Sequence, residues 1–203
     1  MARPRKITDE RLLEAAGTAI ARFGPAFVLA DVAAEAGVTP GTLVHRFGSK
    51  HGLLVAMIDA AIESTRSGTA AEAGDVEDPV TVIRQEIVER YAPLDDPRAA
   101  ANNLAQLAFD LSDEVLRARM ADLHAAIEAR IEPLLAHAAH TGDLPGAPPA
   151  PVAARILAAL ADGTAIRWSA NPRGGLCARL RDDLDAVLAG WATRHPPNQR
   201  RMI

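Results

Sequence analysis

Residues 31–50 read DVAAEAGVTPGTLVHRFGSK, and they contain what two short crossed helices require. A helix-turn-helix needs a small residue where the helices touch, a glycine at the turn, a cap for the second helix and an apolar anchor inside it. Ala33, Gly37, Thr39 and Leu43 supply these four features in that order. The stretch therefore predicts a helix-turn-helix.

Helical periodicity continues on both sides of this stretch, and no segment shows the alternation of a strand. We therefore expect an all-α fold, in which a three-helix head precedes a C-terminal helical bundle. About nine helices are expected, over about Thr8–Phe23, Leu29–Ala36, Thr39–Phe47, Lys50–Ser67, Pro79–Tyr91, from after Pro97 to Leu111, from Ser112 to the loop that starts at Thr141, Val152–Ser169 and Leu176–Thr193. Pro133 falls inside the seventh helix and should kink it. The segments 67–78 and 141–151 are expected to be loops, and the tail from His195 to be disordered.

Charge divides the chain into two parts. Residues 1–51 contain seven of the 22 basic residues and five of the 26 acidic ones, a net charge of +2, which leaves −6 for the rest. A positive end joined to an acidic body is typical of a DNA-binding head attached to a domain that does not bind DNA. We expect residues 1–51 to bind DNA and residues 52–203 to bind an effector and dimerise.

Several functional classes are disfavoured by what the sequence lacks. Cys177 is the single cysteine, so an internal disulfide and a cysteine-based zinc site are excluded, and a reducing cytoplasm fits best. No apolar run is long enough to span a membrane, and the N-terminus does not resemble a secretory signal. No catalytic motif is present, so we expect neither an enzyme nor a cofactor. His137 and His140 share a helix face without an acidic partner nearby, and we interpret them, with His124, as solvated rather than metal-binding.

The quoted stretch, followed by Leu53-Leu54, resembles the signature of the TetR family of repressors, over about Ile7 to Met57. Farther along, Glu128–Asn171 resembles the subgroup typified by the choline-responsive repressor of the betaine pathway. The resemblance implies a homodimeric transcriptional repressor in the bacterial cytoplasm, released from a palindromic operator by a small, mostly apolar effector. Activation in place of repression remains open.

The DNA-binding residues follow from the motif and from the resemblance. The helix that contains Leu43 leaves one face free to enter a major groove. The resemblance assigns base contacts to that face and phosphate contacts to Thr39 and Lys50. The full expected set is Thr39, Pro40, Gly41, Thr42, Val44, His45, Arg46 and Lys50. Arg3, Arg5 and Lys6 resemble a basic arm that lies along the duplex, although a merely solubilising terminus is an equal alternative.

Three departures from the family pattern bear on how the head would dock. Val44 stands where the family usually has a phosphate-binding tyrosine, and Phe27-Val28 where a serine or threonine usually caps the second helix. His51-Gly52 replaces the usual acidic pair. These changes predict weaker anchoring to the DNA backbone or an altered docking, and Val44 could instead touch a thymine methyl group.

The C-terminal part carries an expected effector pocket and an expected dimer interface. The pocket residues would combine hydrogen-bonding groups with aromatic and apolar ones, although exposed polar residues and ordinary core would explain them as well. This set is Tyr91, Asn103, Gln106, Leu107, Phe109, Leu123 and Trp168. The resemblance implies a four-helix bundle made from the last two helices of each protomer, through Ile156, Leu160, Gly163, Leu184, Leu188 and Trp191.

Two other functional classes compete with the regulator. The departures at Val44 and Phe27-Val28 leave room for a helical ligand-binding protein whose DNA affinity is weakened or lost. A helical-bundle enzyme is a weaker alternative, which a bound metal or organic cofactor would support. Salt-sensitive binding to a palindromic DNA fragment separates a regulator from both.

Overall fold

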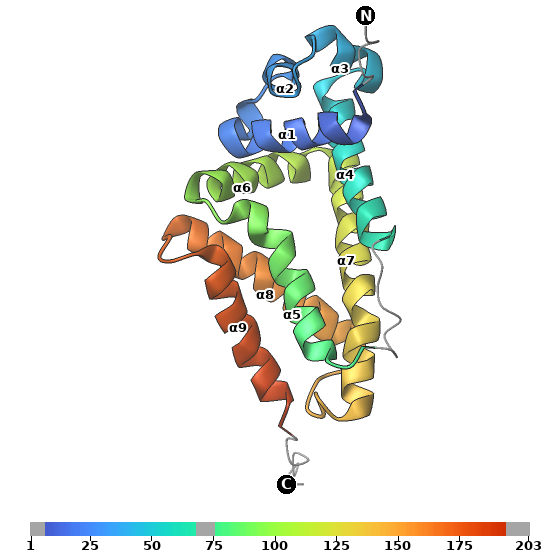
Figure 1. Ribbon diagram of the computed structural model, residues 1–203, viewed down its shortest axis with the longest axis vertical. Coiled ribbons are helices and arrows are strands. Elements are labelled where there is room, and N and C mark those ends of the chain that lie inside the picture. The colour runs from blue at the N-terminus through green and yellow to red at the C-terminus, as the bar shows by residue number, and fades with distance from the viewer. Residues whose placement is uncertain (1–6, 68–75, 194–203) are drawn as a thin grey trace, which may run out of the picture. The chain divides into compact units, whose positions relative to one another are not determined.

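The computed structural model describes residues 7–67 and 76–193, and these ranges contain α-helices, short 3-10 turns and no strands (Figure 1). The described helices are α1 (Asp9–Phe23), α2 (Leu29–Ala36), α3 (Pro40–Phe47), α4 (Lys50–Ser67), α5 (Pro79–Tyr91), α6 (Pro97–Ser112), α7 (Glu114–Thr141), α8 (Ala150–Ala170) and α9 (Leu176–Trp191), with 3-10 turns η1 (Gly24–Ala26) and η3 (Ala92–Leu94). The all-α prediction is confirmed. The expected basic arm, the disordered tail and most of the loop at 67–78 lie outside the described residues.

The helices begin where short polar side chains can accept a free amide hydrogen. Thr8, Ser49, Asp78 and Asp96 each accept a hydrogen bond from the amide three residues on, at 3.4, 3.1, 3.0 and 2.8 Å. Such a cap satisfies one of the four amides that a helix leaves unpaired at its start. These local signals explain why the predicted and observed boundaries agree so closely.

Several other boundaries differ from prediction by one or two residues. α8 begins at Ala150 rather than Val152, because Pro151 is tolerated in a first helical turn. α7 begins at Glu114, where the Asp113 carboxylate accepts hydrogen bonds from two amides at 3.0 Å each. Pro133 lies inside α7, and the helix continues through it to Thr141.

The chain forms two compact units, each made from segments that are distant in sequence. The first comprises residues up to 67 together with 93–125, and the second comprises 68–92 together with 126 onward. The first unit therefore contains α6 and the beginning of α7 in addition to the helix-turn-helix. The functional boundary expected after residue 51 falls inside α4, so it differs from this structural division and stays a prediction.

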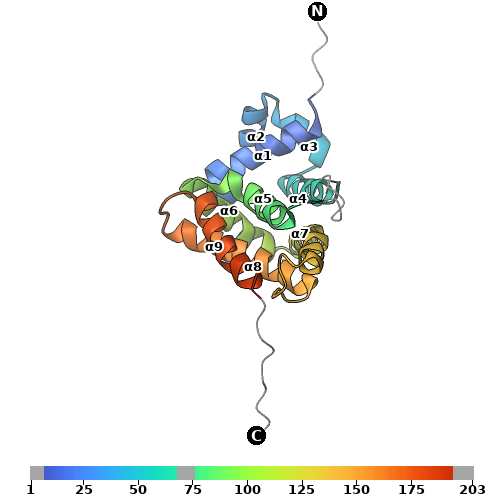
Figure 2. The ribbon, with the colours of Figure 1, turned by 60° about the horizontal axis from the view of Figure 1, so that its bottom comes forward.

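The core of the first unit forms around α1. Its buried side includes Leu12, Ala16 and Ile20, which are 0%, 0% and 5% exposed. α2 packs on one side of α1 and α6 on another, and Figure 2 shows α2 and α3 gathered beside α1. α6 thus supports the three-helix head through α1 and η1.

The second unit has its own apolar core between α5, α7, α8 and α9. Ile83, Leu134, Leu157 and Leu180, one from each helix, are all at most 1% exposed. At its edge, the Arg130 guanidinium donates two hydrogen bonds to the Glu86 carboxylate, at 2.9 and 2.7 Å. The two parallel hydrogen bonds form because the planar guanidinium fits the two oxygens of a carboxylate, and they join α7 to α5.

Tyr91 gives this second unit a measurable pH response. Its hydroxyl donates to the Asp162 carboxylate, and burial, followed by the negative charge of Asp162, raises the pKa of Tyr91 far above 10. Because the folded pKa is raised, the stabilisation is complete below the unfolded pKa of about 10 and is lost as the pH rises beyond it.

The chain has one tyrosine, so tyrosinate absorbance at 295 nm reports Tyr91 alone. We expect no absorbance increase at pH 10, and a later increase that coincides with loss of helical circular dichroism. Tyr91→Phe should show no such absorbance change at any pH. A titration of the folded protein centred near pH 10 would contradict this hydrogen bond between Tyr91 and Asp162.

Candidate nucleic-acid interface

α3 is held in place by one fully buried side chain and one tight turn. Leu43 is 0% exposed, and it packs in the interior of the first unit while its helix lies at the surface. Between α2 and α3, Gly37 has φ 68° and ψ 33°, the left-handed conformation that only glycine adopts without strain. The Val38 amide donates to the Ala33 carbonyl at 2.9 Å and closes the turn. The local prediction of the motif is confirmed.

The opposite face of α3 is open to solvent. Thr39, Pro40, Gly41, Val44 and His45 are exposed, and Val44 is 50% exposed although it is apolar. This face belongs to an eight-residue helix and is uncharged apart from its C-terminal end. A major groove is wide enough to admit an α-helix.

Thr39 occupies the predicted cap position of α3 without forming the predicted side-chain cap. Its backbone is extended, with φ −88° and ψ 152°, and no amide in the described part of the chain caps onto its hydroxyl. The Thr42 amide bonds instead to the Thr39 carbonyl at 2.9 Å. The Thr39 hydroxyl lies 3.3 Å from the Thr42 hydroxyl, so both remain near the exposed face.

Two of the cations expected at the interface are turned toward the protein. Arg46 is partly buried and donates to the carbonyl of Ile7 at 3.0 Å and to the carboxylate of Asp9. The Lys50 ammonium donates to the carbonyls of Pro25 and Phe27, at 2.6 and 2.7 Å. Arg46 thus ties α3 to the start of α1, and Lys50 ties the start of α4 to the segment before α2.

The start of α2 shows how the chain accommodates one of the departures from the family pattern, Phe27-Val28. Phe27 is 0% exposed and fills the interior, whereas Val28 is 54% exposed and its side chain cannot cap a helix. The Asp31 carboxylate accepts from the Val28 amide at 2.8 Å. One half of a capping arrangement is therefore kept, and the hydroxyl that could have bound a phosphate is absent.

His51 joins the start of α4 to the end of α6. Its Nε2 lies 3.2 Å from the carboxylate of Asp113, the residue that caps α7. The backbone hydrogen bond from Leu116 and the side-chain bond from His51 lower the pKa of Asp113. His51, which stands where the family usually has an acidic residue, is thus paired with a residue 62 positions farther along the chain.

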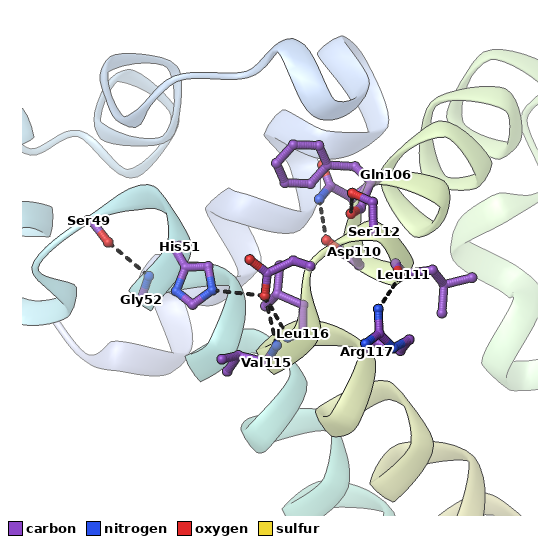
Figure 3. Close-up of polar contacts among 12 residues, drawn as sticks. Ser49, His51, Gly52, Gln106, Asp110, Leu111, Ser112, Val115, Leu116 and Arg117 are labelled. Atoms are coloured by element: carbon purple, nitrogen blue, oxygen red, sulfur yellow. Dashed lines mark hydrogen bonds and ion pairs between the residues drawn. The ribbon is translucent and has the colours of Figure 1, made fainter.

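α6 carries a polar network that the sequence did not place. The Asn102 amide donates to the Ala21 carbonyl of α1 at 2.8 Å, next to Gly24. One turn farther, Gln106 donates to Asp110 at 2.7 Å, and both side chains are more than nine-tenths buried (Figure 3). Burial raises the pKa of Asp110, and Gln106 and Lys50 partly offset this. The only sign of this network in the sequence was a set of polar residues beside the apolar stripe of the helix. That pattern did not identify the partners of those residues.

The expected effector residues do not all lie in one compact unit. Tyr91 and Trp168 belong to the second unit, and the remainder belong to the first, namely Asn103, Gln106, Leu107, Phe109 and Leu123. Within the second unit, Trp168 is 6% exposed and donates to the Gly174 carbonyl at 3.2 Å, which closes the turn between α8 and α9.

Two members of the first-unit set also have local roles. The Asn103 side chain bonds back to the Ala99 carbonyl of its own helix at 2.8 Å. Gln106 keeps its Oε1 without a hydrogen-bond partner among the described residues. Gln106 is therefore the member of this set with unused hydrogen-bonding capacity. The shallow groove between α1 and α2, lined in part by Thr18, Arg22 and Glu35, involves none of the seven.

The expected dimer residues separate into buried and accessible groups. Leu184 and Leu188 are 0% and 3% exposed inside the core of their own protomer, so they cannot face a partner as expected. They are buried because α9 packs against both α5 and α8. Leu160 and Trp191 are partly buried against the same core, whereas Ile156 of α8 is 40% exposed. Gly163 is half-buried.

Within the described ranges, no three His, Cys, Asp or Glu side chains are grouped to hold a metal ion. None of the helices in those ranges is both long and apolar enough to cross a membrane. Cys177 is buried in the apolar core of the second unit.

Comparison with known proteins connects this geometry to a family. The family profile described as "Bacterial regulatory proteins, tetR family" matches residues 12–57, which span α1 to the first part of α4. Over 171 residues the chain is 30% identical to the HTH-type transcriptional regulator TtgR of Pseudomonas putida, and the match covers 81% of each chain.

Solved structures resemble the chain over most of its length. A TetR-family transcriptional regulator from Rhodococcus sp. superposes with a TM-score of 0.67 at 27% identity, covering 91% of this chain and 98% of that one. SmeT, described as the repressor of the Stenotrophomonas maltophilia multidrug efflux pump SmeDEF, gives a TM-score of 0.66 at 23% identity, with 92% and 91% covered. The likeness to SmeT at this identity concerns the fold.

Proposed function

The chain belongs to the TetR family of bacterial regulatory proteins, and on this basis we propose that it is a homodimeric repressor released from a palindromic operator by a small, mostly apolar effector. Members of the family are DNA-binding transcription regulators and not enzymes. Repression, the palindrome and the effector class are the proposed parts. A repressor of this kind would work in the cytoplasm, where its DNA lies.

The observation that carries the proposal is the division of α3 into two faces. Leu43 is fully buried, whereas the neighbouring Val44 and His45 are exposed. A rigidly anchored helix with a free face is what base recognition in the major groove requires. We assign base contacts to His45, Val44 and Thr42, with Pro40, Gly41 and Arg46 beside them, and a phosphate contact to the Thr39 hydroxyl.

A second copy of the chain is needed because one helix of this length reads few base pairs. In a two-fold dimer the two α3 helices would reach half-sites about 34–36 Å apart, or a multiple of that spacing. On α8, Ile156 and Ile166 remain 40% and 46% exposed, and Gly163 would allow close approach of a second helix. We therefore place the dimer contact on the exposed face of α8.

Effector binding would act through the helices that touch the head. We propose that α6 contributes Gln106 to the effector site, since its Oε1 is buried and no described residue bonds to it. α4 connects the head to the remainder of the chain and would transmit the effect of the effector to the head. The affinities for operator and effector would then be coupled reciprocally. Membership of the betaine-pathway subgroup rests on Glu128–Asn171, where Leu144 is buried after the turn at Gly142.

Selection from a random library of duplex DNA tests the central claim. The purified chain should enrich a palindrome, and its affinity for the recovered duplex should fall linearly with the logarithm of salt concentration, with a slope of about −0.9 for each phosphate contact. Fluorescence anisotropy at several salt concentrations measures this slope. Because Arg46 and Lys50 are already paired, we expect fewer phosphate contacts than the six to ten, roughly, of strong DNA binders. Failure to enrich any duplex would contradict a regulator.

One alternative is favoured by a specific observation. The inward bonds of Arg46 and Lys50, together with valine at position 44, remove three groups that could bind phosphates. A ligand-binding protein of this fold that has lost DNA affinity would show the same features. It would bind small apolar molecules in a thermal-shift screen and enrich no duplex. A repressor would bind such molecules and would also enrich a duplex.

A further inference from the structure

Lys50, the first residue of α4, has an ammonium group committed to the backbone of a distant segment. Its Nζ donates to the Pro25 carbonyl at 2.6 Å and to the Phe27 carbonyl at 2.7 Å. Pro25 lies in η1, and Phe27 comes directly before Val28, the N-cap of α2. The two bonds therefore tie the start of α4 to the start of α2, across 25 and 23 residues of chain.

Aromatic rings complete the surroundings of this ammonium. Its Nζ lies 4.1 Å from the centre of the Phe27 ring and 5.8 Å from that of Phe109 on α6. Burial lowers the pKa of Lys50, and the negative charges of Asp110 and Asp31 act against this shift. A cation among two carbonyls and two ring faces is well satisfied where it stands.

A phosphate contact would compete with this arrangement. The ammonium has three donors, and two of them are used by carbonyls. Swinging Nζ toward a duplex would break both bonds and leave two carbonyl oxygens of the turn without that donor. The position of Lys50 thus favours a role inside the protein over one on its surface.

We propose that Lys50 is a positioning residue, which sets the start of α2 relative to α4 by holding the Pro25 and Phe27 carbonyls and does not itself bind a DNA phosphate. The inference rests on the proposed function. It assigns Lys50 a role different from the phosphate contact that the family resemblance implies.

The need for such a device follows from the first turn of α2. Val28 has no side-chain acceptor, so the cap interaction that the structure describes there is the bond from its amide to Asp31. Lys50 fixes this segment in another way, because its ammonium binds the Pro25 and Phe27 carbonyls that precede α2. α2 packs on α3, so an error at the start of α2 would be transmitted to the exposed face that contains Val44 and His45.

Two substitutions separate the two roles, and the free protein is measured first. Lys50→Met keeps the aliphatic stem and removes the donors, whereas Lys50→Arg keeps the charge in a planar, larger group. By hydrogen exchange without DNA, both variants should lose protection at the hydrogen-bonded amides that open α2, those of Val28 and Asp31. Amides of α9 serve as the internal reference and should be unchanged. Arg22→Met removes an exposed cation from the same unit and should alter neither set.

DNA binding is then measured on the duplex recovered by selection, at several salt concentrations. We expect Lys50→Met to bind about tenfold more weakly at every concentration, the size expected for lost charged hydrogen bonds, with an unchanged salt slope. Lys50→Arg should be impaired to a similar extent. A phosphate ligand would behave differently: Lys50→Met would reduce the slope by about 0.9, and Lys50→Arg would bind normally.

The two kinds of readout keep the possible failures apart. Normal exchange protection of α2 in both variants, or a reduced slope with full rescue by arginine, would overturn the positioning role. If the unaltered chain enriches no duplex, the proposed function fails, while the exchange measurement still decides whether Lys50 holds the start of α2. If Lys50→Met does not fold, Lys50→Arg alone provides the test.

Discussion

Replacing Gly52 with alanine lowers the free energy of unfolding by about 1–3 kcal/mol, the usual effect of forcing an atom into filled space. Gly52 lies in the first turn of α4. A Cβ there would overlap the carbonyl oxygen of Phe47 and lie 3.2 Å from its carbonyl carbon. Phe47 is the last residue of α3, so the obstruction is backbone that can move only together with α3. Strain at this joint outweighs the better helix propensity of alanine, which is worth about 1 kcal/mol.

Gly17 provides the matched control. It lies inside α1, and apart from its chain neighbours and the adjacent backbone of α1 none of the described atoms lies within 4 Å of the position where its Cβ would be. Gly17→Ala should therefore stabilise the protein by about 0.5–1 kcal/mol. Urea unfolding of both variants gives the two free energies, and anisotropy on the selected duplex should show a loss of affinity for Gly52→Ala alone. Equal stabilisation by both substitutions would mean that the joint between α3 and α4 is not closed as described.

Leu43→Ala lowers the free energy of unfolding by about 2–5 kcal/mol, whereas Val44→Ala changes it by less than about 0.5 kcal/mol. The two residues are neighbours on one helix, but Leu43 is 0% exposed and Val44 is 50% exposed. Removing the Leu43 side chain leaves a cavity under α3, because the well-packed surroundings relax only in part. Urea unfolding measures both values. Equal losses would contradict the division of α3 into an anchored and a free face.

Val44→Ala should act on DNA recognition. If its side chain touches a thymine methyl group, the lost contact is worth about 0.8 kcal/mol in each half-site, the value of one buried methylene. Uracil lacks that methyl group, so replacing the contacted thymine with deoxyuridine in the selected duplex should weaken the unaltered protein and leave Val44→Ala unaffected. Independent, additive losses from the two changes would show that Val44 reads something else.

Much of the fold could be predicted because its signals are local. The helix boundaries follow from caps such as Thr8 and Asp96, from prolines in first turns and from the left-handed turn at Gly37, each set by residues three or four positions apart. The buried anchor at Leu43 follows from the period of the helix. None of these features depends on what the rest of the chain does.

The fate of individual site residues could not be predicted in this way. Lys50 was expected at a phosphate and bonds to carbonyls in its own protein, and Leu184 and Leu188 were expected at a partner and lie in their own core. Spacing along the chain shows which face of a helix a residue occupies, but not which neighbour covers that face.

The helix-turn-helix is specified within its own residues, because caps, a glycine turn and apolar spacing act over a few positions and need no distant partner. Three other outcomes required the folded chain: which cations stay free for DNA, that α6 packs against α1, and which leucines of α9 are enclosed. These outcomes depend on segments that meet only after folding, such as Asn102 with Ala21 across 81 residues. Such pairings are set by the shape of the whole unit rather than by any local pattern.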